Sequence, residues 1–153
     1  MSSALDALRG RVAFVQSQSA NLRPAVRQIH STWIKDRKAD FASGGSTTAH
    51  GRWQSNALST MQRKGHGRVL FGMPADGYQL HKSIVDRRHT DHVFRWSPAG
   101  NSVELGTKHW KARIHQLGLG AKGIVRRPID PTPAQRNGYA TVLTDWILKG
   151  TLS

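Results

Sequence analysis

The first apolar residues of the chain recur at the spacing of an α-helix. They predict a helix over residues 3–18, whose apolar stripe consists of Leu5, Leu8, Val12 and Val15. Ser3, with Asp6 three residues later, resembles a capping box at the start of this helix. We expect one domain over residues 1–153, with residues 1–20 forming a helical extension.

A second, longer stripe predicts a helix over residues 21–41. Asn21 can cap this helix, and Pro24 lies near its start, where a missing N–H costs little. The apolar positions at helical spacing are Leu22, Val26, Ile29, Trp33 and Phe41. We expect this stripe to lie in the core or in a subunit interface. The carboxylates of Asp36 and Asp40 are expected to be solvated and matched by neighbouring cations.

The next segment is rich in residues that favour turns. Residues 42–52 are predicted to form a flexible loop, which a partner could order. Ser55 could cap a short helix that ends at Gly65, with Leu58 and Met61 facing inward. Residues 68–73 have the composition of a short strand.

The alternation of side chains between the two faces of a strand is clearest between residues 84 and 106. His92, Phe94 and Trp96 would lie on one face of a strand, residues 97–101 supply a turn, and residues 103–105 alternate in a returning strand. This pattern predicts an antiparallel hairpin.

Two helices are predicted after the hairpin. The first covers residues 108–118, with Trp110, Ile114 and Leu117 on one face and a glycine, Gly118, at its C-cap. The second begins at a capping box formed by Thr132 and Gln135 and ends before Gly150; its stripe is Tyr139, Val142, Leu143, Trp146 and Ile147. The chain is thus predicted to be α+β, with a small antiparallel sheet packed against N-terminal and C-terminal helices.

Charge adds a functional constraint. The chain carries 23 Lys and Arg against 9 Asp and Glu, a net charge of +14 that is spread along the sequence and attracts polyanions. Because there is no cysteine, disulfides, thiol catalysis and cysteine-ligated zinc are excluded. No apolar run approaches the roughly 20 residues of a membrane span, so no membrane contact is expected.

Motifs for catalysis or metal binding are not found in the sequence. His109 and His115 are six residues apart and point to different sides of a helix, and His89 and His92 would lie on opposite faces of a strand. Residues 118–123 lack the spacing of a phosphate-binding loop. We therefore expect no enzyme, and no catalytic, cofactor-binding or metal site.

Several short motifs follow one another between roughly residues 20 and 150. They are a glycine-rich loop before Trp53, a leucine–serine helix ending in Lys64–Gly65, a strand with Val103, Gly106 and Thr107, a helix with Ala112, Ile114, His115, Gln116 and Gly118, and the pair Arg127–Pro128. In order and spacing they resemble the phage virion morphogenesis family, the tail completion proteins of Mu-like phages. Asp76 replaces the family's usual threonine, and Ile129 replaces its usual aromatic residue.

The resemblance implies a non-enzymatic structural virion protein. Such a tail completion or terminator subunit would form a homo-oligomeric ring, expected to be hexameric, at the head-proximal end of a phage tail. It would join tail to head, contact other tail and neck proteins, and assemble in the host cytoplasm. The structural residues that the resemblance implies are Trp53, Lys64, Gly65, Gly106, His115, Gln116, Gly118, Arg127 and Pro128.

The same resemblance suggests a role for part of the positive charge. Cations in the hairpin and the following loop could face DNA in the channel of a ring or make salt bridges between subunits; the candidates are Arg87, Arg88, Lys122, Arg126 and Arg127. His115 is expected to hydrogen-bond the backbone near the glycine turn. The alternative function is a basic nucleic-acid-binding protein without ring assembly.

Overall fold

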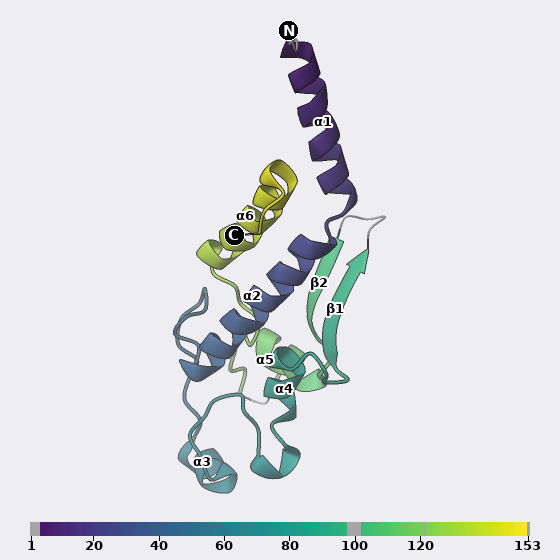
Figure 1. Ribbon diagram of the computed structural model, residues 1–153. Coiled ribbons are helices and arrows are strands. Elements are labelled where there is room, and N and C mark those ends of the chain that lie inside the picture. The colour runs from purple at the N-terminus through teal and green to yellow at the C-terminus, as the bar shows by residue number, and fades with distance from the viewer. Residues whose placement is uncertain (1–3, 98–101, 121, 153) are drawn as a thin grey trace.

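The computed structural model describes residues 4–97, 102–120 and 122–152 (Figure 1). In chain order the elements are α1 (Ala4–Ala20), α2 (Arg23–Ala42), α3 (Leu58–Lys64), the 3₁₀ turn η1 (Pro74–Asp76), α4 (Gln79–Val85), β1 (His92–Ser97), β2 (Ser102–Thr107), α5 (Trp110–Leu117) and α6 (Pro133–Lys149). The predicted α+β class is confirmed: a two-stranded antiparallel sheet packs with the N-terminal and C-terminal helices. No helix among these residues has the length and apolarity that crossing a membrane requires.

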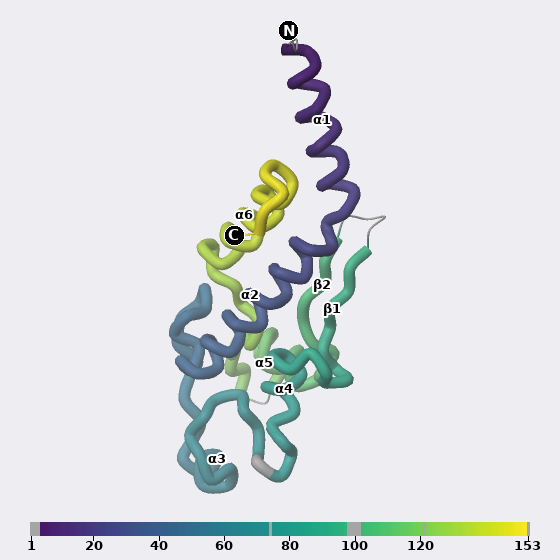
Figure 2. Tube along the Cα trace, in the orientation of Figure 1, coloured from purple at the N-terminus to yellow at the C-terminus, as the bar shows by residue number. Residues whose placement is uncertain are grey.

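Helix α2 runs through the middle of the molecule, between α6 and the hairpin (Figures 1 and 2). Its predicted stripe is buried at Val26, Ile29, Trp33 and Phe41, which confirms that this face lies in the core. The helix begins at Arg23 without a side-chain cap, so the expected Asn21 cap is wrong. Instead, the Asn21 carbonyl accepts a hydrogen bond from the indole N–H of Trp146 at 2.8 Å, which ties the start of α2 to α6.

Helix α6 forms as its sequence predicts. The Thr132 hydroxyl accepts the backbone N–H of Gln135 at 3.1 Å, and the Gln135 side chain accepts the backbone N–H of Thr132 at 2.8 Å. The helix ends at Gly150, which has a left-handed φ of 69°. Val142 is buried against Ala25 and Ile29 of α2, and these contacts form the smaller of two core clusters.

The hairpin is shorter than predicted at its start. Residues 84–85 belong to α4, and residues 86–91 form turns, so His89 is not in a strand. From there the register is regular, with Val93 opposite Gly106 and Trp96 opposite Val103. Of the turn predicted at residues 97–101, residues 98–101 lie outside the described part of the chain, as does Ser3 of the predicted first cap.

Several short-range predictions are wrong. Helix α3 begins at Leu58, Ser55 does not cap it, and the Leu58 side chain is exposed. Residues 68–73 are not a strand, because the backbone turns at Leu70, whose φ is 63°. Ala42 still belongs to α2, and residues 43–52 form successive turns and bends, in which Gly45 packs beneath Trp53; whether the loop is flexible stays a prediction.

The apolar stripe of α5 predicts which face of the helix is buried, but the structure buries the opposite face. Its one buried residue is Ala112, while Trp110 and Leu117 are 64% and 57% exposed. The Gln116 carboxamide donates to the Ile129 carbonyl at 3.0 Å, so a polar contact with the following segment orients the helix. The C-cap at Gly118, with a φ of 67°, is as predicted.

A buried ion pair lies inside the body where solvated carboxylates were expected. Arg37 and Asp40 have side-chain exposures of 0%, and Arg37 Nη1 lies 2.9 Å from Asp40 Oδ2. Arg37 Nη2 also donates to Gln135 Oε1 at 2.8 Å, and Asp40 Oδ1 accepts the Thr47 hydroxyl at 2.6 Å. Burial raises the pKa of Asp40, which outweighs the lowering by Thr47 and by the charge of Arg37.

Breaking this pair from one side should strongly destabilise the fold. Asp40→Ala leaves the Arg37 charge buried and uncompensated, so we expect a loss of about 3–5 kcal/mol in the free energy of unfolding by urea. The double variant Arg37→Met/Asp40→Leu should be more stable than Asp40→Ala, since it removes both charges from the interior. The control is Arg95→Ala, which breaks an exposed pair with Glu104 and should cost about 1 kcal/mol or less. Equal losses in Asp40→Ala and Arg95→Ala would contradict the interpretation.

Candidate functional site

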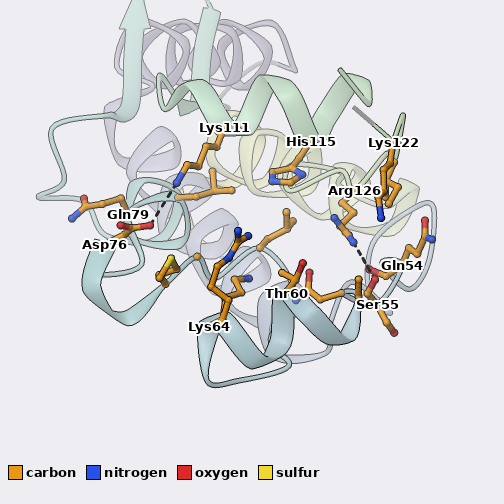
Figure 3. A pocket seen from close by; sticks show the side chains of 18 of the residues that line it. Gln54, Ser55, Thr60, Lys64, Asp76, Gln79, Lys111, His115, Lys122 and Arg126 are labelled. Carbon is orange, nitrogen blue, oxygen red and sulfur yellow. Dashed lines mark hydrogen bonds and ion pairs between the residues drawn. The ribbon is translucent and has the colours of Figure 1, made fainter. Parts of the chain in front are cut away.

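A basic cleft of about 780 Å³ lies between α3 and α5 (Figure 3). Residues 54–57 and α3 form one wall, α5 with residues 122–126 forms the other, and residues between 70 and 80 line the cleft between them. Five cations line the cleft, namely Arg63, Lys64, Lys111, Lys122 and Arg126. Asp76 is the one carboxylate among its described lining residues. Excess positive charge in a concave site attracts anions.

Arg126 holds the two walls together. Its Nε donates to the Gln54 carbonyl at 2.8 Å, and its Nη2 donates to the Ser55 carbonyl at 3.1 Å. The Arg126 backbone N–H donates to the His115 carbonyl at 2.9 Å, which anchors the segment to α5. The spacing of these cleft residues in the sequence gives no sign that they meet.

The other cations of the cleft are only partly matched. Lys64 Nζ donates to the Arg68 carbonyl at 3.3 Å, and Lys111 Nζ lies 3.7 Å from Asp76 Oδ2. Burial lowers the pKa of Lys64, and the charges of Arg126, Arg63 and Lys111 lower it further. Cations that repel one another in this way would be stabilised by a bound anion.

His115 faces the cleft from α5 (Figure 3). Burial, followed by the charges of Arg126, Lys64 and Lys111, lowers its pKa to about 4, so the imidazole is neutral near pH 7. The expected hydrogen bond from its ring to the nearby backbone is not formed with any described residue; the backbone carbonyl of His115 makes that link instead. His109 has a role that its sequence position did not predict, because its Nδ1 accepts the Lys111 backbone N–H at 3.3 Å and caps α5.

Most motif residues behind the resemblance lie against residues 123–129, whereas Lys64 and Gly65 form the end of α3. The Trp53 indole N–H donates to the Arg127 carbonyl at 3.1 Å, and Pro128 is buried. A Cβ on Gly45 would lie 2.6 Å from Trp53 Cγ, and one on Gly118 would lie 2.9 Å from the Gly123 carbonyl oxygen. These residues therefore brace the wall that carries Arg126.

The five predicted channel or interface cations do not form one surface. Lys122 and Arg126 line the cleft. Arg127 lines a separate hollow with His50 and Asp130. Arg87 and Arg88 lie beside α2. In the described residues no three histidine or carboxylate side chains are grouped as ligands for a metal ion.

Comparison with protein-family models, curated proteins and solved structures finds no match to this chain. The resemblance to tail completion proteins therefore rests on the sequence motifs. The geometry of the cleft supports the binding of an anionic group, such as a carboxylate or a phosphate.

Titration of His115 should destabilise the folded protein in acid. The folded state keeps the neutral imidazole to about pH 4, whereas in the unfolded chain the solvated ring takes up its proton near pH 6.5. The stability that this difference supplies is complete above pH 6.5 and is lost as the pH falls toward 4. We expect the unfolding free energy to fall with pH over this window, by at most about 1.4 kcal/mol per pH unit for this one proton.

Two measurements check this titration. NMR of the His115 ring should give a midpoint at a pH of about 4, and inorganic phosphate bound in the cleft should raise it. His115→Gln should reduce the pH dependence of urea unfolding between about pH 7 and 5. A midpoint near 6.5 would show that the imidazole is not desolvated.

Proposed function

We propose that this chain is a structural, non-enzymatic subunit of a phage tail. It would act as a tail completion or terminator protein, which self-associates into a ring at the head-proximal end and joins tail to head. Its place would be the virion, and its partners other tail and neck proteins. The observation that carries the proposal is the apolar stripe that α1 leaves exposed.

Helix α1 projects away from the body, at the opposite end of the molecule from α3 (Figure 1). It has 17 residues and none is buried; Leu5 and Leu8 are 53% and 60% exposed. Toward its C-terminal half it rests on α6, where the Arg11 guanidinium donates to the Leu148 carbonyl. The stripe of Leu5, Leu8 and Val12 is thus held in place and uncovered, as expected of a contact element.

A second exposed apolar surface lies on α5 and the segment after it. It consists of Trp110, Leu117, Leu119 and Val125, and we call it the α5 patch. Two different apolar surfaces on one subunit suit a head-to-tail contact, in which the α1 stripe of one copy covers the α5 patch of the next. A contact of this kind produces a ring when its rotation closes. A hexamer is the symmetry that the resemblance implies.

The basic cleft gives this subunit a surface for an unlike partner. The chain itself has only 9 acidic residues against 23 basic ones, so an anionic group in the cleft is better supplied by another molecule. A neighbouring tail or neck protein with an acidic segment would meet this need. The motif residues around Trp53 and Gln116 support the fold of the cleft wall, in line with the structural role that the resemblance implies.

Charge placed on either apolar surface should abolish self-association. We expect wild-type protein to have the mass of a closed oligomer by light scattering, and Leu8→Glu/Val12→Glu and Trp110→Glu to be monomers. These side chains are exposed, so the unfolding free energy of each variant should change by about 0.5 kcal/mol or less. The matched control is Ala13→Glu, which adds charge to another side of α1 and should keep the wild-type mass.

Mixing the two monomeric variants distinguishes the possible contacts. The α1 variant retains its α5 patch, and Trp110→Glu retains its α1 stripe, so a head-to-tail contact predicts a dimer in the mixture. If α1 paired with α1, the Trp110→Glu variant would keep the wild-type mass. Wild-type protein that stays monomeric at low and high salt, and that does not appear on phage tails by electron microscopy, would contradict the proposal.

A further inference from the structure

A shallow groove runs along the exposed side of α2. Three hollows of about 640, 450 and 360 Å³ lie on this side, and all three include Ser31. Neighbouring hollows also share Arg27 or Arg87. They therefore adjoin one another along α2, and we call the three hollows together the α2 groove. Its second bank is made by residues 85–88 and by β1.

Cations follow this groove along its length. Arg23, Arg27, Lys35 and Lys38 all line it from α2. Arg23 and Lys38 are 15 positions apart, which corresponds to about 22 Å at the rise of an α-helix. The opposite bank adds Arg87 and Arg88, and Arg87 Nη2 reaches across to the Ser31 hydroxyl at 2.7 Å.

Negative charge is scarce in the α2 groove. Asp86 is the one carboxylate among its described lining residues, and its Oδ1 already accepts the Arg88 backbone N–H at 2.9 Å. The described lining residues of the groove thus include six cations, arranged along the length of the groove, and one acid.

Aromatic rings line the β1 side of the groove. Phe94 is 37% exposed, and its ring stacks on His30 with 4.1 Å between ring centroids and 6° between planes. Burial, followed by the charges of Arg87 and His92, lowers the pKa of His30 to about 4, so this stack is neutral near pH 7. Trp96 lies farther along β1, with the Arg23 guanidinium over its ring at 5.8 Å. Flat rings beside a line of cations suit bases attached to a phosphate backbone.

We propose that the α2 groove binds nucleic acid through its phosphodiester backbone, without reading the sequence. The length of the cation line favours a polymer with regularly repeated negative charge, and Phe94 offers a surface on which an unpaired base can stack. The compact basic cleft has neither feature. This inference does not rest on the proposed function, because the α2 groove shares no residue with the α1 stripe or the α5 patch.

Salt-dependent binding tests the groove. The probes are a fluorescein-labelled single-stranded DNA of about 16 nucleotides and the duplex of the same sequence, titrated at several salt concentrations. We expect both to bind, and Lys35→Gln/Lys38→Gln/Arg88→Gln to lower the slope of log K against log salt by about 2 for the single strand and about 3 for the duplex. At about 0.1 M salt the affinity should fall at least roughly tenfold. The three side chains are exposed, so the variant should fold.

A matched variant separates the groove from net charge. Arg52→Gln/Lys108→Gln/Arg113→Gln removes three exposed cations outside the groove and should change the slope by less than about 1. Equal losses in the two triple variants would overturn the proposal, since binding would then follow net charge alone. No binding by wild-type protein at roughly 10⁻⁴ M in low salt would also overturn it.

Two further arms identify the ligand. Phe94→Leu should weaken single-strand binding severalfold and leave duplex binding unchanged, because paired bases do not need the ring. Poly-glutamate of equal charge should compete more weakly than the oligonucleotide. If it competes more strongly, the groove belongs to an acidic protein and the proposal fails. The oligomeric mass of the proposed ring is measured without nucleic acid, so either idea can fail alone.

Discussion

The charge of Arg37 has to be matched inside the protein, and much of the fold follows from how this is done. Asp40 supplies the counter-charge from the next turn of α2, and Gln135 supplies an acceptor from the capping box of α6. Asp40 in turn holds the Thr47 hydroxyl and, through its carbonyl, the Gly45 backbone N–H at 2.8 Å. Two segments far apart in the sequence, namely the end of α2 with the turns after it and the start of α6, therefore meet at one buried pair. Separating them would leave a desolvated charge unpaired.

The fixed position of α2 determines which surfaces stay open. Helix α6 covers one side of α2. Toward the C-terminal end of α2, the apolar core stripe of this helix packs on Trp53 and on residues in and around α4. The side of α2 that carries its lysines and arginines stays uncovered and forms the α2 groove with β1. Trp53 connects the buried pair to the cleft. It lies over Gly45, and its indole N–H donates to the Arg127 carbonyl, next to Arg126, whose side chain links the two cleft walls.

The molecule thus separates its apolar and charged surfaces. The α1 stripe and the α5 patch are apolar and differ from each other, which favours contact between unlike surfaces of identical subunits. The cleft and the α2 groove are both basic but differ in shape, since one is compact and the other extends along a helix. A subunit built in this way can contact its own copies through one pair of surfaces and anionic molecules through the other.

Local patterns in the sequence determined the caps of α6, the ends of α3 and α5 at Gly65 and Gly118, the core face of α2 and the pairing of β1 with β2. Each depends on residues close together in the chain, or on one periodic stripe. Periodicity shows which face of a helix is apolar but not whether another element covers it, so only the structure decided that the α1 stripe and Trp110 are exposed. Only the tertiary structure decided that Asp40 is buried and that Lys64, Lys111 and Arg126 share a cleft. Both outcomes depend on contacts between distant segments. These contacts contribute more free energy than the local preferences that charge and hydropathy patterns reveal.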